Sequence, residues 1–456
     1  MQPRYSFRGP LRRRESTATR AQDQSPSMGE AQPTIRLEDI TPSKGSLVCT
    51  FTYGTKLEDY LNSSVLYFNY DTTVEGVPRG VLSIPPLGVL APLAWITGAV
   101  VAAKEVDNQY LSSLQQVAAV MQKMYPSVRI SSAMDCTGVA TPWPESDERS
   151  CLLYSGGVDS TTSLLRNLGP NLSLVSIRGT PDLRLWEGEY WNRVQQSLVP
   201  LVQGLGIKRH VIETNALDVV NLNGLNRAFE SAFERGWWEN LSHGLLLLSL
   251  CAPLTYQRGI RKLMIASSFS RKHSEPWGSN PAADQSIGWG GLTTIHDSYD
   301  LTRLQKVREV LVPYMKEHSG AVQLRVCTGK REVRLASGGL NCGKCEKCTR
   351  TMLSLLCSGA DPAECGFPTL NFAEMKAGLI SGRLRTQRGY SMQTLHNEKS
   401  PPKPELNLRY PGFSEFLDWF YNWEFPLPRK RRGILRRLAP CGTRRRRVFD
   451  ALFTSP

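Results

Sequence analysis

Residues 155–160 read Ser-Gly-Gly-Val-Asp-Ser, between an apolar run at 151–154 and a helical pattern at 161–168. A strand that turns through two glycines into a helix directs unpaired amide N–H groups and the positive helix end at one point. Gly156 and Gly157 let an anion approach the backbone closely, and the hydroxyls of Ser155 and Ser160 add donors. We therefore interpret residues 155–160 as a phosphate loop.

The aspartate of this loop, Asp159, adds a carboxylate to the hydroxyl and amide donors. Carboxylate oxygens are preferred ligands of magnesium, so Asp159 can hold an ion that neutralises phosphate charge. The alternative interpretation is a turn that ends in an Asp or Ser helix cap. Six matched positions in a strand–turn–helix context favour the phosphate loop. The stretch is not a Walker loop, because the Lys-Ser/Thr ending is missing.

The segments around the phosphate loop alternate in type. Apolar runs predict strands, and longer patterned segments predict helices at 190–205 and 241–258; the strands are expected at 151–154, 172–177, 208–213 and 262–266. This order predicts an α/β fold with a mostly parallel sheet, helices on both faces and ligands at the carboxyl edge. Residues 34–145 are predicted to precede it as an α+β module, with strands at 47–53 and 65–70 and a helix at 109–124.

One segment is apolar enough to raise the question of a membrane span. Residues 81–103 carry no charged side chain and are long enough to cross a bilayer. However, Pro85, Pro86 and Pro92 interrupt any single helix. We therefore predict no span, and expect a strand at 80–84, a buried helix at 88–96 and a strand at 99–103.

The net charge of +14 is concentrated at the two ends of the chain: residues 1–20 carry +5 and residues 401–456 carry +7. Residues 429–447 contain ten basic side chains and no acid. Such a tail is attracted to nucleic acid or to acidic partners, and it is equally typical of a solvated tail. Eleven cysteines without a secretory signal favour the cytoplasm, where clustered thiols indicate metal binding.

The second strong motif is a group of cysteines. Cys342, Cys345 and Cys348 are spaced by two residues each, and Cys327 lies fifteen residues upstream of Cys342. Zinc binds four thiolates tetrahedrally, and Cys-x2-Cys steps let neighbouring thiolates reach one ion. We therefore predict a structural Zn²⁺ site. An iron–sulfur cluster has the same ligand count and is the alternative.

Together, these motifs resemble a known family. The stretch at 155–160 is similar to the pyrophosphate loop (PP-loop) of the N-type ATP pyrophosphatases. A late four-cysteine knuckle adds a resemblance to 7-cyano-7-deazaguanine synthases over roughly 151–350. Weaker matches follow in order at 240–248, 265–268, 280–284 and 301–306. Residues 177–180 depart from the family's aromatic-Gly-Gln-basic-His stretch, and the gap between Cys327 and Cys342 is longer, which leaves the substrate open.

The resemblance implies an adenine nucleotide alpha hydrolase-like fold and an AMP-forming ligase that uses ATP and Mg²⁺. A deazapurine-like carboxylate would be adenylated and converted with ammonia to an amide or nitrile. The phosphate loop would hold pyrophosphate, with Asp159 on magnesium. By the same resemblance, Ser176 and Ile177 would hold adenine, Arg303 and Lys306 would act at the α-phosphate, and Asp284 would bind a purine-like edge.

The expected organisation has four parts: a disordered basic N-terminus at 1–33, an accessory domain at 34–145, a PP-loop domain with the knuckle at 146–380, and an extension with the Arg-rich tail at 381–456. We expect a cytoplasmic homo-oligomer. Two alternatives stay open. One is a PP-loop enzyme that adenylates a transfer RNA base and grips the RNA through the tail. The other is a non-catalytic nucleotide-binding component of a larger complex.

Overall fold

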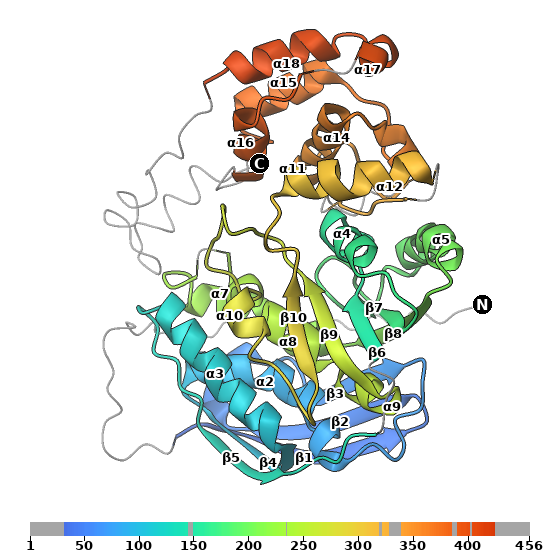
Figure 1. Ribbon diagram of the computed structural model, residues 1–456. Coiled ribbons are helices and arrows are strands. Elements are labelled where there is room, and N and C mark those ends of the chain that lie inside the picture. Colours follow the sequence, from blue (N-terminus) through green and yellow to red (C-terminus); the bar gives the residue numbers. More distant parts are fainter. Residues whose placement is uncertain are drawn as a thin grey trace, which may run out of the picture. The chain divides into compact units, whose positions relative to one another are not determined.

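The computed structural model describes residues 32–144, 149–233, 235–318, 322–327, 339–384, 390–401 and 404–424. The interpretations of the N-terminal residues 1–31 and of the Arg-rich tail lie outside these residues. Within them the chain forms one ten-stranded mixed sheet with flanking helices, an α/β architecture (Figure 1). The strands are β1 (Thr34–Ser43), β2 (Ser46–Tyr53), β3 (Val65–Tyr70), β4 (Val100–Asp107), β5 (Met134–Val139), β6 (Arg149–Leu153), β7 (Leu172–Arg178), β8 (Lys208–Thr214), β9 (Ile260–Ala266) and β10 (Thr293–Asp297).

Helices take up most of the rest of the described chain. They are α1 (Arg79–Leu82), α2 (Ile84–Thr97), α3 (Asn108–Met124), α4 (Val158–Arg166), α5 (Gly188–Gly204), α6 (Ala216–Val219), α7 (Leu222–Ala228), α8 (His243–Ser249), α9 (Ala252–Gln257), α10 (Pro281–Asp284), α11 (Arg303–Gln305), α12 (Val312–Glu317), α14 (Glu346–Ser358), α15 (Phe372–Ser381), α16 (Tyr390–Asn397), α17 (Pro404–Arg409) and α18 (Phe413–Asn422). Short 3₁₀ helices η1 (Thr55–Tyr60) and η4 (Pro362–Cys365) and π-helices η2 (Trp238–Ser242) and η3 (Lys306–Leu311) complete the set.

One half of the sheet is entirely parallel and confirms the strands expected from the apolar runs. Its order is β10-β9-β6-β7-β8, with parallel pairing at every step. The chain runs from β6 outward to β8, then returns to place β9 on the other side of β6. The strand order therefore reverses between β6 and β9. At such a switch point the loops that leave neighbouring strands diverge, which opens a crevice at the carboxyl edge.

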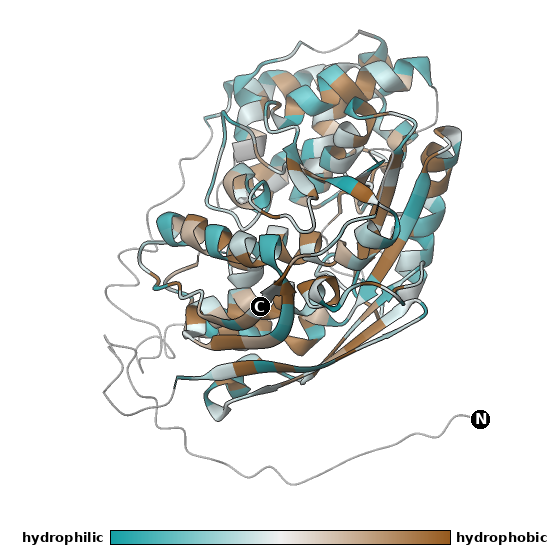
Figure 2. Cartoon of the chain, turned by 60° about the horizontal axis from the view of Figure 1, so that its bottom comes forward, coloured by the Kyte–Doolittle hydropathy of each residue, from teal (hydrophilic) through white to brown (hydrophobic). Residues whose placement is uncertain are grey.

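Both faces of the parallel half are covered, as the alternation of strand and helix patterns predicts. Cys151 and Leu263 point to one face, where they join the core built around α2 and α8. Their neighbours Leu152 and Met264 point to the other face and pack with α4 and α5. Successive strand residues alternate between faces, so every such strand needs apolar side chains throughout. In Figure 2 the brown, hydrophobic residues lie on strands and on helices of the described chain.

The N-terminal segment extends the same sheet. Strand β3 pairs antiparallel with β8, and β2 and β1 continue antiparallel from it, followed by the parallel pairs β1–β4 and β4–β5. The sheet therefore crosses the boundary expected near residue 145. Strands β2 and β3 and helix α3 confirm the elements expected at 47–53, 65–70 and 109–124.

The strand expected at 80–84 is wrong. Residues 79–82 form α1, and α2 follows at once with Pro85 and Pro86 in its first turn. The two prolines start the helix there, because the first N–H groups of a helix have no intrahelical partner to lose. Helix α2 is buried from Ile84 to Ile96. No helix in the described part of the chain has both the length and the apolar character that crossing a bilayer requires.

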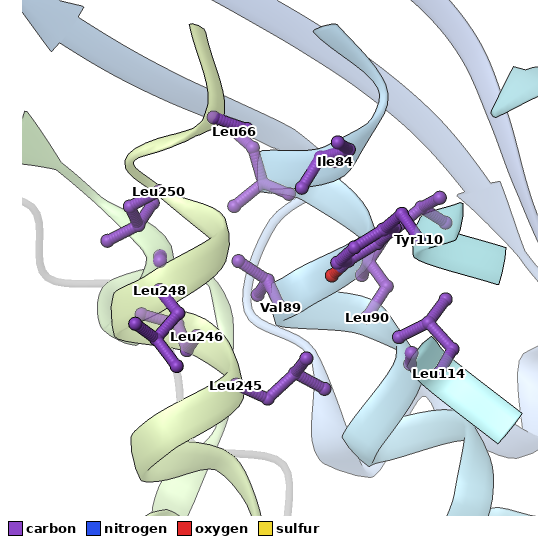
Figure 3. Close-up of a cluster of buried hydrophobic side chains, with 14 of the residues drawn as sticks. Leu66, Ile84, Val89, Leu90, Tyr110, Leu114, Leu245, Leu246, Leu248 and Leu250 are labelled. Carbon is purple, nitrogen blue, oxygen red and sulfur yellow. The ribbon is translucent and has the colours of Figure 1, made fainter. Parts of the chain in front are cut away.

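Helices α2 and α8 pack in close contact at the centre of this core. Figure 3 shows Val89 of α2 and Leu245 of α8 between the two helices, while Leu90 lies on the other side of α2, toward Tyr110 and Leu114. The two backbones approach closely at Gly88, where an added Cβ would lie 2.4 Å from the Cβ of Ser249. That contact distance leaves no room for even one methyl group.

We predict that Gly88→Ala lowers the free energy of unfolding by about 1–3 kcal/mol, because overpacking must push the two helices apart. Urea unfolding checks this value. The matched control is Gly204→Ala in α5, where an added Cβ meets nothing within 4 Å. Equal stabilities for both variants would contradict the close packing of α2 on α8.

Candidate nucleotide site and metal centre

The phosphate loop connects the end of β6 to the start of α4. Gly156 has a φ of 74°, a left-handed conformation that favours glycine. Gly157 is the N-cap residue of α4, and no side chain caps this helix end. Ser155 and Ser160 turn their hydroxyl oxygens toward each other at 3.1 Å. Among the described residues, no side chain accepts from the N–H groups of Val158 and Asp159 at the start of α4, and the Asp159 carboxylate does not serve as a helix cap.

Asp159 is instead held by two cations from a distant part of the chain. Its carboxylate accepts a hydrogen bond of 2.7 Å from Arg303 and one of 2.9 Å from Lys306. Lys306 is buried, with only 1% of its side chain exposed, and its ammonium group also donates to the carbonyl of Ser267 just after β9. The three residues of the predicted catalytic set thus meet at the switch point between β6 and β9.

The local sequence explains why these cations stay in place. Thr302 and Gln305 form a capping box that fixes the start of α11, the short helix that begins with Arg303. The next turn, from Lys306, is a π-helix, η3. A π-helical turn contains more residues than an α-helical turn, and such turns are often found at functional sites. The wider turn changes the direction in which its side chains point. Here the wider turn begins at the lysine that reaches Asp159.

The pKa values of Asp159 and Lys306 are both lower than the ordinary values of these groups. Burial on its own raises the pKa of the Asp159 carboxyl, but the charges of Arg303 and Lys306 outweigh burial and lower it. Burial lowers the pKa of Lys306, against the effect of Asp159. An ionised Asp159 is the form that a magnesium ligand needs.

Two further arginines lie at this site, and neither was selected from the sequence. Arg350, on α14, is buried and lies 3.4 Å from Glu346, and its charge helps to lower the pKa of Asp159. Arg325 donates its Nε–H to the carbonyl of Ser155 at 3.0 Å. Each lies two residues from one of the four predicted metal-binding cysteines: Arg350 follows Cys348, and Arg325 precedes Cys327. This spacing could have identified both arginines as candidates from the sequence. Cations therefore outnumber acids around the loop.

The predicted adenine residues lie on the next strand. Ser176 and Ile177 lie near the end of β7, just before its final residue Arg178, and β7 pairs directly with β6. The Ser176 hydroxyl is buried and donates to the carbonyl of Tyr154 at 2.7 Å, immediately before the phosphate loop. This hydrogen bond joins the end of β7 to the residue that precedes the phosphate loop.

Asp284 lies in a buried polar cluster. One carboxylate oxygen accepts from Ser279 at 2.7 Å and lies 2.7 Å from Nδ1 of His296 on β10, while the other has no hydrogen-bond partner among the described residues. Asp284 has no exposed surface. The carboxylate is enclosed here, so direct contact with a ligand would require its surroundings to open.

An aromatic group, which we call the ring cluster, lies next to Asp284. It comprises Trp238, His243, Phe269 and Trp277, whose neighbouring ring centroids are 5.2–5.7 Å apart. Burial lowers the pKa of His243 to about 4, so this imidazole is neutral at neutral pH. Phe269 follows Ser267 after β9, and Ser267 is bound by Lys306. The ring cluster and the phosphate loop are therefore connected through the end of one strand.

The four predicted cysteines meet at one point. The sulfurs of Cys327, Cys342, Cys345 and Cys348 all lie within 4.8 Å of one another. Two of the sulfur–sulfur distances are 3.9 Å, close to the value of about 3.8 Å that tetrahedral Zn–S bonds of about 2.3 Å require. This cysteine centre can hold one metal ion and fits Zn²⁺, with Gly343 in the turn at a φ of 70°.

Comparison with known proteins adds no name to this geometry. No protein-family model matches the chain, and neither the curated proteins nor the solved structures that were searched contain a match.

The cysteine centre predicts that the purified protein holds about one zinc per chain, measured by elemental analysis. Replacing Cys345 and Cys348 together by serine should remove the metal, because two thiolates alone cannot complete the site. Cys136→Ser is the control, since this cysteine lies outside the centre. Full zinc in the double variant would contradict the ligand assignment.

We also predict that Asp159→Asn lowers stability at pH 7 by about 3 kcal/mol, because it leaves the buried Lys306 charge without its carboxylate. The lowered pKa of Asp159 means that its ion pairs stabilise the fold above the ordinary value of 3.8. The difference between variant and wild type should therefore shrink as the pH falls below that value.

Denaturant unfolding over a pH series measures this difference. Asp300→Asn serves as control, since Asp300 pairs with Arg166 at the surface with half its side chain exposed, and should cost less than about 1 kcal/mol. A difference that stays constant down to acid pH would show that the Asp159 charge is not involved.

Proposed function

We propose that this protein is an AMP-forming, ATP-dependent ligase with a PP-loop fold, similar to the 7-cyano-7-deazaguanine synthases. The observation that carries the proposal is the meeting of an uncapped, glycine-containing helix start with Asp159, Arg303 and Lys306 at the switch point of a parallel sheet. A strand-order reversal is where nucleotides bind in such sheets, and a surplus of cations suits a polyphosphate.

In this proposal the β- and γ-phosphates rest on the amides at the start of α4 and on the hydroxyls of Ser155 and Ser160. Adenine lies along the end of β7, at Ser176 and Ile177. Asp159 would hold Mg²⁺, which would supply positive charge against the phosphates. In the described state its two oxygens bind Arg303 and Lys306, so both cations lie close enough to the phosphate loop to contact bound phosphates.

The reaction begins with a carboxylate oxygen of the acceptor attacking the α-phosphorus of ATP. The bond from this phosphorus to the bridging oxygen breaks, and pyrophosphate leaves with the electron pair. Negative charge increases on the leaving group, where Arg303, Lys306 and the loop amides stabilise it. Ammonia then attacks the acyl carbon of the adenylate and AMP leaves, which yields an amide. A nitrile requires a further loss of water from that amide.

The acceptor side is assigned to the ring cluster and to Asp284. Flat aromatic walls suit a planar heterocycle, and a carboxylate with one unpartnered oxygen suits an N–H edge. Phe269 of the ring cluster follows β9 two residues after Ser267, whose carbonyl Lys306 binds, and Asp284 contacts His296 on the neighbouring strand β10. A deazapurine-like acid held there would direct its carboxylate toward the phosphate loop.

We predict that the protein releases AMP from MgATP when it is given ammonium and a suitable acid from a panel of deazapurine carboxylic acids, followed by mass spectrometry. Ser160→Ala should lower this rate about a hundredfold, because it removes one donor to the leaving pyrophosphate. Ser163→Ala is the matched control: it lies one turn further along α4 and contacts Ser298 instead.

Equal rates for the two serine variants would contradict the phosphate loop. ATP binding without AMP release for any acid would instead favour the non-catalytic alternative.

A further inference from the structure

One short segment from the C-terminal half lies directly against the phosphate loop. The backbone N–H of Arg325 donates to the carbonyl of Gly156 at 2.7 Å, and its Nε–H donates to the carbonyl of Ser155 at 3.0 Å. One residue therefore binds two consecutive carbonyls of the loop. The Cβ of Arg325 also lies 3.8 Å from the position that a Cβ on Gly156 would occupy, so the contact is close along its length.

These two hydrogen bonds determine where the loop amides point. In a planar trans peptide the C=O and the next N–H point in opposite directions. Holding the Ser155 carbonyl toward Arg325 turns the N–H of Gly156 away from it. Holding the Gly156 carbonyl does the same for Gly157. In the described state the N–H of Gly157 donates to the hydroxyl oxygen of Ser155 at 3.4 Å, a weak contact that an anion would replace. Consecutive backbone amides that face one anion form an anion-binding concavity.

We propose that Arg325 is a positioning residue that holds the phosphate loop open for pyrophosphate, an inference that rests on the proposed nucleotide site. Its role is to donate to the loop backbone, which differs from the charge supplied by Arg303 and Lys306. The side chain is half-buried rather than free in solvent, as a fixed donor requires.

The segment that carries Arg325 is itself anchored next to the cysteine centre. The side chain of Asn341 donates to the carbonyl of Leu324 at 2.7 Å and accepts from the N–H of Val326 at 3.0 Å, on either side of Arg325. Asn341 is 1% exposed and directly precedes the metal ligand Cys342. Cys327 follows Arg325 by two residues. Asn341 and Cys327 thus tie the segment that orients the loop to the cysteine centre.

Three substitutions separate a backbone donor from a phosphate-binding charge. Arg325→Gln removes the charge but places an amide N–H the same number of bonds from the backbone as the arginine Nε. Arg325→Lys keeps the charge and has a methylene at that position. Arg325→Met has neither a donor nor a charge, at a similar length.

Titration calorimetry with inorganic pyrophosphate measures the effect on the site without turnover. We expect Met and Lys to weaken binding about tenfold and Gln to stay within about threefold of wild type, since one charge-assisted hydrogen bond is lost or replaced. Amide hydrogen exchange across residues 155–160, measured without ligand, should be faster in Met and Lys than in wild type and Gln. Zinc content and thermal unfolding identify variants that are merely misfolded; if Met fails to fold, the comparison of Gln with Lys still decides.

Wild-type binding by the Met variant would overturn the positioning role, and so would rescue by Lys but not by Gln, which would indicate a direct charge contact. A wild-type protein that does not bind pyrophosphate would overturn the proposed nucleotide site and this inference with it. Weaker pyrophosphate binding in the Arg325→Met and Arg325→Lys variants alone, with wild-type protein and Arg325→Gln unaffected, supports both the nucleotide site and the positioning role of Arg325.

Discussion

The partly buried ion pairs of Asp159 with Arg303 and Lys306 are the constraint on which the rest of the site depends. A lysine with 1% of its side chain exposed carries a large desolvation cost, and Asp159 and the Ser267 carbonyl are the groups that offset it. This requirement joins three elements: the loop after β6, the π-helix η3, and the end of β9. Those elements border the only reversal of strand order in the parallel half of the described sheet. The same charges that stabilise the fold are therefore gathered where an anionic ligand would bind.

The site combines a loop from the sheet with basic side chains from the C-terminal part of the chain. The strands supply the loop, but Arg303, Lys306, Arg325 and Arg350 all come from residues after β10. Two of them are tied to the neighbourhood of the cysteine centre, so a metal ion there would stabilise more than the local knuckle. In physical terms, the metal would reduce the freedom of the segment that orients the loop amides. Figure 1 shows this C-terminal group of helices next to α4, the helix that begins at the loop.

Sequence reasoning reached much of this arrangement where the signal is local. Apolar runs predicted β6 to β9, and the spacing of four cysteines predicted that they converge. Strand β1 was not expected, because a register shift between Leu37 and Asp39 breaks its alternation. Strand β10 carries too few apolar residues to be recognised, since it lies at an edge. Helix α1 was mistaken for a strand because two prolines were taken to end regular structure, whereas here they begin a helix.

The contacts that matter most in the site are not local, and they could not be obtained from periodicity. Lys306 and Asp159 are separated by 147 positions, and Arg325 and Ser155 by 170. The pairing of His296 with Asp284 likewise depends on how β10 passes α10. A motif indicates which side chains have suitable chemistry. Only the packing of the C-terminal elements on the sheet determines which cations reach the loop.

The proposed function depends on the binding of nucleotide phosphates by residues 155–160. A crystal structure of the protein with Mg²⁺ and a non-hydrolysable ATP analogue tests it most directly. We expect the β- and γ-phosphates to lie on the amides of Gly156, Gly157 and the first turn of α4, with Asp159 on the metal. An analogue bound elsewhere, or a loop whose carbonyls rather than amides face the ligand, would contradict it.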